Sequence, residues 1–163
     1  MIKQFFLRTL SSLLLLLNFA HVGYSQILKP VKWTFNVNRI NDCEAELIFK
    51  AKIDKGFHVY SQFLDGNDGP VATTFNFEKS NDCQFQGKVL EGKPIEEYDP
   101  NFEMKLKFFA NEATFKQKIK ISNLKAFSVK GYLNFMVCDE TKCLPPEDVD
   151  FEFKMMAAPG KPC

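Results

Sequence analysis

The sequence predicts an all-β protein that folds as one antiparallel β-sandwich. Three observations carry this prediction. Apolar and polar residues alternate with a period of two along most of the chain after residue 26, and clusters of turn-forming residues separate the alternating runs. No segment after residue 26 shows a helical stripe of apolar residues. The 18 phenylalanines supply the apolar bulk for the core of such a sheet.

The expected strands follow in chain order. Trp33, Phe35 and Val37 mark the first, and residues 47–53 form the second, with lysines and a glutamate facing water between its apolar positions. The pattern returns at residues 75–77, 104–108, 115–121, 127–137 and 149–153. Turn residues such as Asn41-Asp42 and Ser122-Asn123 divide these runs. Seven to nine short antiparallel strands in a chain of this size favour an immunoglobulin-like sandwich.

The N-terminus, residues 1–25, predicts a secretory signal peptide. Lys3 and Arg8 precede an apolar stretch over residues 10–19, and the small-x-small pattern Gly23-Tyr24-Ser25 stands just before Gln26. The apolar stretch is shorter than the roughly 20 residues that a membrane-spanning helix needs. We therefore expect a protein exported to a compartment outside the cytoplasm, with one domain over residues 26–156, a flexible tail over residues 157–163, and no insertion into the membrane after cleavage. In that compartment disulfides form and persist.

The charge balance excludes several classes of function. Lysine and arginine total 21 and aspartate and glutamate total 20, so no basic surface predicts nucleic acid as a partner. The sequence shows no Ser/His/Asp arrangement, glycine-rich phosphate loop or paired carboxylates that would indicate a hydrolase or a kinase. A protein or a small molecule is the expected partner.

The chain has five cysteines, and two of them stand close together at the end of a predicted strand. A tight turn between Cys138 and Cys143 would let the two sulfurs meet. Chain entropy gives a disulfide across so small a loop about 2 kcal/mol, against about 4 kcal/mol for one between Cys43 and Cys83. The short pair is therefore a poor staple, which favours a reactive pair. Cys43 and Cys83 either form a structural disulfide or are two buried thiols, and Cys163 lies on the tail without a clear role.

Several motifs occur together in one order along the chain. They are Gly56-Phe-His-Val-Tyr-Ser-Gln62 with Gly69-Pro70, the segment 94–102, and Phe135-Met-Val-Cys138-x4-Cys143-Leu-Pro-Pro146 with the strand after it. This combination resembles the periplasmic N-terminal domain of the thiol:disulfide interchange protein DsbD. The best-known members have one more residue between the cysteines, and there the domain is fused to a membrane electron conduit and a thioredoxin-like domain. Here we expect a stand-alone version.

The resemblance implies an immunoglobulin-like domain that accepts electrons from a thioredoxin-like donor and passes them to oxidised exported proteins. The clients would include disulfide isomerases and thioredoxins of cytochrome c biogenesis, so the chain would be one component of a protein-disulfide reductase. By matching position, Cys143 would attack the partner and Cys138 would resolve the mixed disulfide. The resemblance also implies an aromatic cap loop over the disulfide, with Tyr98 and Phe102 as candidates. No cofactor or bound metal is expected.

The residues beside the cysteines agree with these roles. Lys142 would favour a thiolate at Cys143, whereas Asp139 and Glu140 would disfavour one at Cys138. Pro145 and Pro146 cannot donate ladder hydrogen bonds, so strand pairing would end just beyond Cys143 and leave its sulfur accessible.

Two alternatives stay open from the sequence. Cys138 and Cys143, with Met136 or His58, could hold Cu(I), because sulfur ligands select that ion. An immunoglobulin-like interaction module with structural disulfides is the other alternative, because a fold does not fix a function. For His58 and Tyr60 themselves, ordinary packing on a strand is the expectation.

Overall fold

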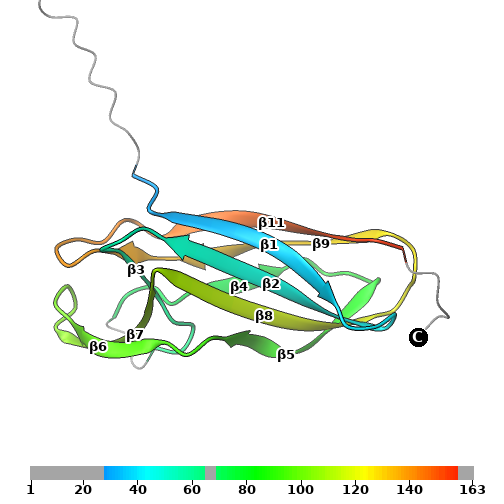
Figure 1. Cartoon of the computed structure of the whole chain (residues 1–163), viewed down its shortest axis with the longest axis horizontal. Coiled ribbons are helices and arrows are strands. Elements are labelled where there is room, and N and C mark those ends of the chain that lie inside the picture. Colours follow the sequence, from blue (N-terminus) through cyan, green and yellow to red (C-terminus); the bar gives the residue numbers. More distant parts are fainter. Residues whose placement is uncertain (1–27, 65–68, 158–163) are drawn as a thin grey trace, which may run out of the picture.

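The computed structural model describes residues 28–64 and 69–157 (Figure 1). The regular elements in these ranges are eleven β-strands, and this confirms the predicted all-β fold. The predicted signal peptide, nearly all of the predicted tail, and Cys163 lie outside the described residues. Within the described ranges no helix is long and apolar enough to cross a membrane.

Two sheets form the body of the sandwich. One has the order β1 (Val31–Arg39), β2 (Glu44–Ile53), β8 (Glu112–Ile121) and β5 (Cys83–Glu91), and the other the order β11 (Glu147–Met155), β9 (Phe127–Phe135) and β4 (Thr74–Phe77). All neighbouring strands are antiparallel. In Figure 1 the two sheets lie along the long axis, with β1 and β11 next to each other at one side.

The phenylalanines of the alternating strands fill the space between these two sheets. Phe49 on β2 is fully buried, and the ring centroids of five other phenylalanines lie within 6.1 Å of its own. Those rings come from both sheets: Phe35, Phe75, Phe77, Phe151 and Phe153. Because successive side chains of a strand point to opposite faces, the period of two in the sequence is what brings these rings to one face.

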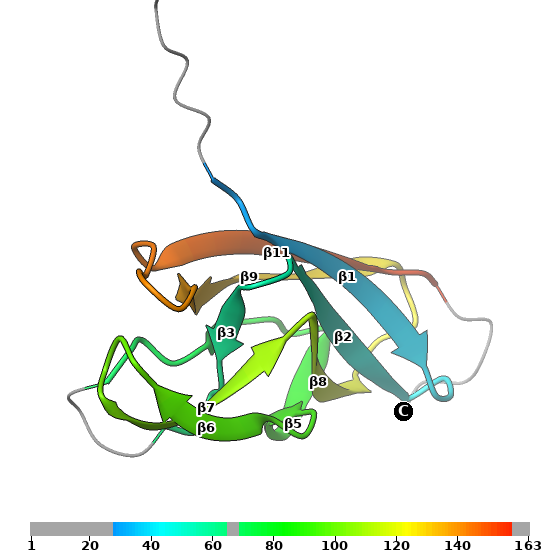
Figure 2. The same cartoon turned by 60° about the vertical axis from the view of Figure 1, so that its left-hand side comes forward.

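A third, smaller sheet stands at one end of the sandwich. It has the order β10 (Val137–Cys138), β3 (His58–Tyr60), β7 (Met104–Ala110) and β6 (Ile95–Asp99). Figure 2 brings β6, β7 and β3 to the front. A second apolar cluster belongs to this sheet, built on the buried Tyr60, Leu106 and Cys138. Phe102, Met136 and Cys143 are among the side chains that pack against it, so the predicted reactive pair lies in a small core of its own.

The structure exceeds the predicted number of strands because edge strands carry a weak pattern. β6 reads Ile-Glu-Glu-Tyr-Asp and only its last residue is buried, while β5 is interrupted by a register shift between Gln86 and Leu90. The predicted run over residues 127–137 is two strands that belong to different sheets, since Met136 separates β9 from β10.

The possible disulfide between Cys43 and Cys83 does not form. Ile121 on β8 donates its backbone N–H to the carbonyl of Cys43 and faces Cys83 across the ladder, so a whole strand separates the two cysteines. Two strand spacings exceed the roughly 7 Å between Cα atoms that a disulfide tolerates. Cys83 is a buried free thiol whose pKa is raised, chiefly by burial, whereas Cys43 is part of a disulfide.

Candidate active site

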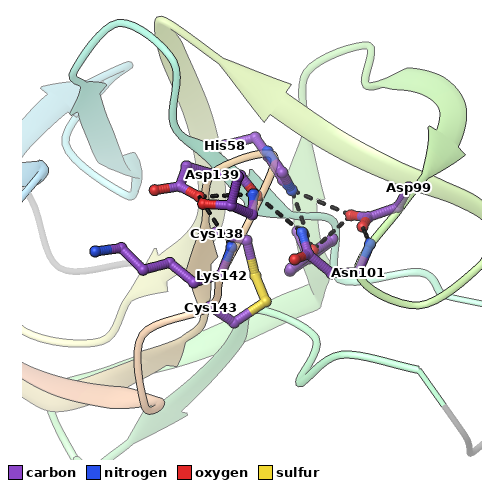
Figure 3. Close-up of a disulfide and its surroundings, with 9 residues drawn as sticks. His58, Asp99, Asn101, Cys138, Asp139, Lys142 and Cys143 are labelled. Carbon is purple, nitrogen blue, oxygen red and sulfur yellow. Dashed lines mark hydrogen bonds and ion pairs between the residues drawn. A yellow bond between two sulfur atoms is a disulfide. The ribbon is translucent and has the colours of Figure 1, made fainter.

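Cys138 and Cys143 form a disulfide across the turn that follows β10 (Figure 3). The two residues face each other as a β-bridge with their Cα atoms 4.0 Å apart. Backbone hydrogen bonds close the hairpin on both sides of the pair, from Asp139 N to Lys142 O and from Leu144 N to Val137 O, each 2.9 Å long. The expected tight turn between the cysteines is therefore present.

The Asp139 carboxylate fixes the shape of this turn. Its Oδ1 accepts hydrogen bonds from the backbone N–H and the hydroxyl of Thr141 and from the backbone N–H of Lys142, at 2.7 to 2.9 Å. These bonds, led by the one from the Thr141 hydroxyl, hold the pKa of Asp139 below its usual range. An aspartate at the first position of a turn is well suited to this, because its side chain reaches the backbone two and three residues ahead.

The two sulfur-bearing residues differ in their access to solvent. Cys138 is fully buried and pairs with His58 on β3, whereas Cys143 is partly exposed. Thiol–disulfide exchange requires direct approach to the sulfur that is attacked. Of the two residues, Cys143 is therefore the one with surface through which a thiolate could approach, and the attacking and resolving roles stay predictions.

Lys142 does not lie against the sulfurs. Figure 3 shows its side chain leaving the turn on the side opposite to the sulfur–sulfur bond, and the side chain is exposed to solvent. Asp139 is the charged group that it influences, since the nearby ammonium contributes to the lowered pKa of that carboxyl. Any effect of Lys142 on a Cys143 thiolate is thus a longer-range one through solvent, which is weak.

The turn that connects β6 and β7, residues 100–103, lies beside the disulfide, and we name it the covering turn. Phe102 in this turn packs into the same small core as both cysteines, and its ring lies edge-on to that of Tyr60 with centroids 5.9 Å apart. Asn101 donates from Nδ2 to the carbonyl of Asp139 at 2.8 Å. This bond joins the covering turn to the turn between Cys138 and Cys143, which we name the redox turn. Of the two cap candidates, the structure brings Phe102 to the disulfide.

Tyr98 takes a different place. It stands on the edge strand β6, its side chain is 61% exposed, and it is not part of the core around the cysteines. It borders a cavity on the other side of His58 and Asp99.

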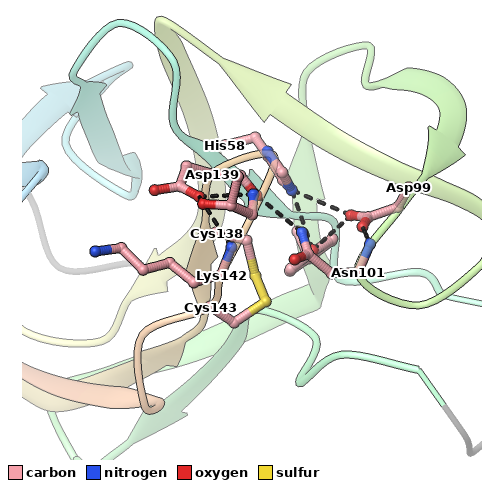
Figure 4. Close-up of polar contacts among 9 residues, drawn as sticks. His58, Asp99, Asn101, Cys138, Asp139, Lys142 and Cys143 are labelled. Atoms are coloured by element: carbon pink, nitrogen blue, oxygen red, sulfur yellow. Dashed lines mark hydrogen bonds and ion pairs between the residues drawn. A yellow bond between two sulfur atoms is a disulfide. The ribbon is translucent and has the colours of Figure 1, made fainter.

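A buried polar network anchors the base of the covering hairpin (Figure 4). Asp99, the last residue of β6, is 1% exposed and accepts hydrogen bonds from Tyr60 Oη at 2.6 Å and from the backbone N–H of Asn101 at 2.8 Å. His58 Nε2 lies 3.2 Å from the same carboxylate and 3.0 Å from Tyr60 Oη. The network thus links β3, which carries the pairing partner of Cys138, to the covering turn.

The network favours an ionised Asp99 and a neutral Tyr60. Burial alone would raise the pKa of Asp99, but the hydrogen bonds from Tyr60 and Asn101 and the proximity of His58 outweigh it, and the pKa is lowered. Burial and the Asp99 charge together raise the pKa of Tyr60. The sequence predicts ordinary strand packing for His58 and Tyr60 and no role for Asp99. One feature of the sequence does indicate the network: residues 58 and 60 share a face of a strand and present two polar groups to one neighbour.

The sulfurs are bonded to each other in this structure. Met136 packs in the same small core as the two cysteines, but within the described residues no group of three or more histidine, cysteine, aspartate or glutamate side chains is placed to hold a metal ion.

A comparison with known families shows which family the chain belongs to. The family model for the N-terminal domain of the thiol:disulfide interchange protein DsbD matches residues 25–154. The chain belongs to this family. As a DsbD N-terminal domain it is a thiol-disulfide exchange domain, and the expected resemblance is confirmed. No curated protein sequence matches the chain significantly.

Solved structures support the fold of this DsbD N-terminal domain. The reduced DsbD N-terminal domain from Neisseria meningitidis superposes with a TM-score of 0.51 at 16% identity, covering 77% of this chain and 86% of that one. The N-terminal periplasmic domain of ScsB from Proteus mirabilis gives a TM-score of 0.56 at 13% identity, covering 82% of this chain but only 49% of that one. This chain therefore spans about half the length of the ScsB domain. The immunoglobulin-like sandwich is thereby confirmed.

Proposed function

We propose that the chain is a periplasmic electron relay that accepts reducing equivalents from a thioredoxin-like donor and delivers them to oxidised exported proteins. The observation that carries this proposal is a disulfide with one accessible and one buried cysteine, placed beneath an aromatic residue of a hairpin turn. The clients we propose are thioredoxin-fold proteins, including disulfide isomerases and those of cytochrome c biogenesis. The periplasmic location is part of the proposal, and its support is the family together with the predicted signal peptide.

The loading step follows from the accessibility of the sulfurs. A donor thiolate attacks Sγ of Cys143, the bond to Cys138 breaks, and Cys138 leaves as a thiolate that takes up a proton. The second thiolate of the donor then attacks the donor sulfur of the mixed disulfide and displaces Cys143 as a thiolate. The donor is now a disulfide, and two electrons reside on Cys138 and Cys143.

The delivery step is the reverse chemistry on another protein. The Cys143 thiolate attacks one sulfur of the client disulfide, and the other client sulfur leaves as a thiolate. Cys138 then attacks Cys143, the disulfide of the domain forms again, and the second client thiolate is released. In the resting domain Phe102 packs in the same small core as Cys143 and narrows the approach to its sulfur, so a partner that displaces the covering turn reacts faster than one that does not.

Trapping of the mixed disulfide tests this proposal. In a Cys83→Ser background, which removes the free buried thiol, Cys138→Ala leaves Cys143 without its resolving partner. Such a variant is expected to form a stable 1:1 adduct through Cys143 with a thioredoxin-fold protein that keeps one active-site cysteine, activated as a mixed disulfide with an aromatic thiol, because the aromatic thiolate leaves and neither protein has a second cysteine to resolve the new bond. Mass spectrometry of the cross-linked peptide identifies the linkage. Cys143→Ala in the same background serves as the matched control and is expected to capture nothing. Capture through another cysteine, or equal capture by both variants, would contradict the assignment.

The reduction potential gives a second, independent test. We expect a reduced thioredoxin-like donor to reduce the Cys138–Cys143 disulfide readily. A potential below about −300 mV would instead identify it as a structural disulfide that resists reduction.

A further inference from the structure

A cavity of about 550 Å³ borders the redox turn and has no role in the exchange steps above. It lies between the start of β3, the β6–β7 hairpin and Glu140 of the turn that joins Cys138 to Cys143. Its volume is within the range of sites that bind small ligands or single side chains of a partner. It adjoins the small core that holds Phe102, since Phe108 belongs to both, and His58 and Asp99 also line it.

The charged side chains that line this cavity are predominantly acidic. Glu97, Asp99 and Glu140 contribute to the lining, and no lysine or arginine among the described residues does so. The carboxylates of Glu97 and Glu140 are exposed, and neither makes an ion pair or a hydrogen bond with another described residue. Asp99 adds a buried negative charge at the base, since its pKa is lowered. Of these three carboxylates only Asp99 has partners in the described part of the chain, including His58 at 3.2 Å, so the uncompensated negative charge of the cavity is that of Glu97 and Glu140.

The remaining walls are aromatic and aliphatic. Phe57 and Phe108 are partly buried in the lining, and Tyr98 at the rim is 61% exposed. A long cationic side chain fits such a mixture, because its methylene stem packs on apolar surface while its head remains with the carboxylates. A guanidinium group gains in addition from the faces of aromatic rings and from charge-assisted hydrogen bonds to carboxylates.

We propose that this cavity receives an arginine or lysine side chain that a redox partner presents beside its reactive cysteine. Glu140 lies three residues before Cys143, so a protein that bonds to the Cys143 sulfur has to lie against the turn that borders the cavity. Docking of the cation would accelerate the encounter with partners that carry it and leave others unaffected. The inference rests on the proposed exchange function and names a chemical feature of its partners.

The test uses reduced full-length protein and short peptides that carry one cysteine activated as a mixed disulfide with an aromatic thiol. Attack by Cys143 at the peptide sulfur releases the aromatic thiolate, which is followed by absorbance, and Cys138 then displaces the peptide thiol. Otherwise identical peptides carry Arg, Gln or Glu at positions two to four residues from the cysteine. The rate with hydroxyethyl disulfide, which is small and uncharged, measures the intrinsic reactivity of Cys143. The rate constant for each peptide is divided by the rate constant for hydroxyethyl disulfide with the same protein variant.

We expect the best Arg peptide to react roughly tenfold faster than its Gln counterpart at low salt, with the Glu peptide slowest, and the preference to shrink as salt screens the charges. The Arg preference is the normalised rate of the Arg peptide divided by that of the Gln peptide. In the double variant Glu97→Gln and Glu140→Gln this ratio should fall to nearly one. Asp42→Asn in the β1–β2 turn of the main sandwich removes one negative charge, as each single glutamate variant does, and should preserve the preference. The two single glutamate variants should each lose part of the preference.

Equal normalised rates for Arg and Gln peptides in the unaltered protein would overturn the inference and leave the exchange function intact. An Arg preference that survives the double substitution, or that Asp42→Asn removes equally, would also overturn it. If neither the peptides nor hydroxyethyl disulfide are reduced, the exchange function itself fails and this inference fails with it.

Discussion

The hydrogen bond from Asn101 to Asp139 should slow the reduction of the disulfide, and the strength of the bond sets the size of this effect. This bond, 2.8 Å from Nδ2 to the carbonyl oxygen, is a side-chain link between the covering turn and the redox turn. A neutral hydrogen bond contributes about 0.5–1.5 kcal/mol net, and we take the lower part of that range because Asn101 is only partly buried. A loss of about 0.5–1 kcal/mol raises the population with an open turn about two- to fivefold.

Asn101→Ala should therefore speed the reduction of the Cys138–Cys143 disulfide by dithiothreitol about two- to fivefold. Samples are quenched at intervals with a thiol-alkylating reagent, and the fraction with two new thiols is read by mass spectrometry. Asn101→Asp, which keeps the size of the side chain but loses the donor, should behave in the same way. The backbone N–H of residue 101, which bonds to Asp99, remains in both variants.

Asn134→Ala is the matched control for this experiment. It removes an asparagine hydrogen bond of similar length, 2.7 Å to Asp148, between β9 and β11 of the main sandwich. It should leave the rate of reduction unchanged. If Asn101→Ala reduces no faster than the unaltered protein while the thermal midpoints of both agree, this hydrogen bond does not limit access to the sulfurs and the reasoning is refuted.

Three further predictions concern the stability of the fold. Because the pKa of Asp99 is lowered in the folded state, the ionised carboxylate stabilises the fold above about pH 4. This stabilisation is lost as the pH falls through the folded-state pKa. Asp99→Asn should therefore destabilise the domain near neutral pH and much less in acid. Urea unfolding at both pH values checks this, and a pH-independent difference would contradict it. Gly131→Ala should lower the thermal midpoint strongly, because a Cβ there would clash with the backbone carbonyl oxygen of Asn76; an unchanged midpoint would mean that β4 and β9 can separate freely. Phe49→Ala should reduce the free energy of unfolding by about 3–5 kcal/mol in urea titrations, and a loss below about 1 kcal/mol would show that the surrounding rings close the space.

The strands that face the main core were predictable because burial on one face imposes a strict period. Residues 47–53 alternate in the sequence, and β2 alternates in burial at those positions. The edge strand β6 was not predictable in this way, because it buries only Asp99 and its exposed positions are free to hold any residue. Pattern reasoning thus succeeds for strands that pack one face against the main core, including the edge strands β1 and β11, and fails for a strand such as β6, which buries a single residue and borders the site.

The candidate site was predictable in its local part only. The cysteine pair lies within one turn, so spacing was enough to place it. The network of His58, Tyr60 and Asp99 joins residues about 40 positions apart, and the partner of a polar side chain at such a distance depends on the order of strands in the third sheet. The same dependence explains the failed pairing of Cys43 with Cys83, since β8 lies between β2 and β5.

The separation of the molecule into a large phenylalanine core and a small core around the cysteines has a consequence for how such a domain can diversify. The side chains that touch the sulfurs belong to β3, β7, β10 and their turns, and they share no buried residue with the main cluster. Substitutions around Cys143 can therefore alter which partners are accepted without disturbing the scaffold that keeps the chain folded. A designer who exchanges this small core would have to keep Val59, Phe109 and Val137, because these alternate positions of the same strands belong to the main cluster.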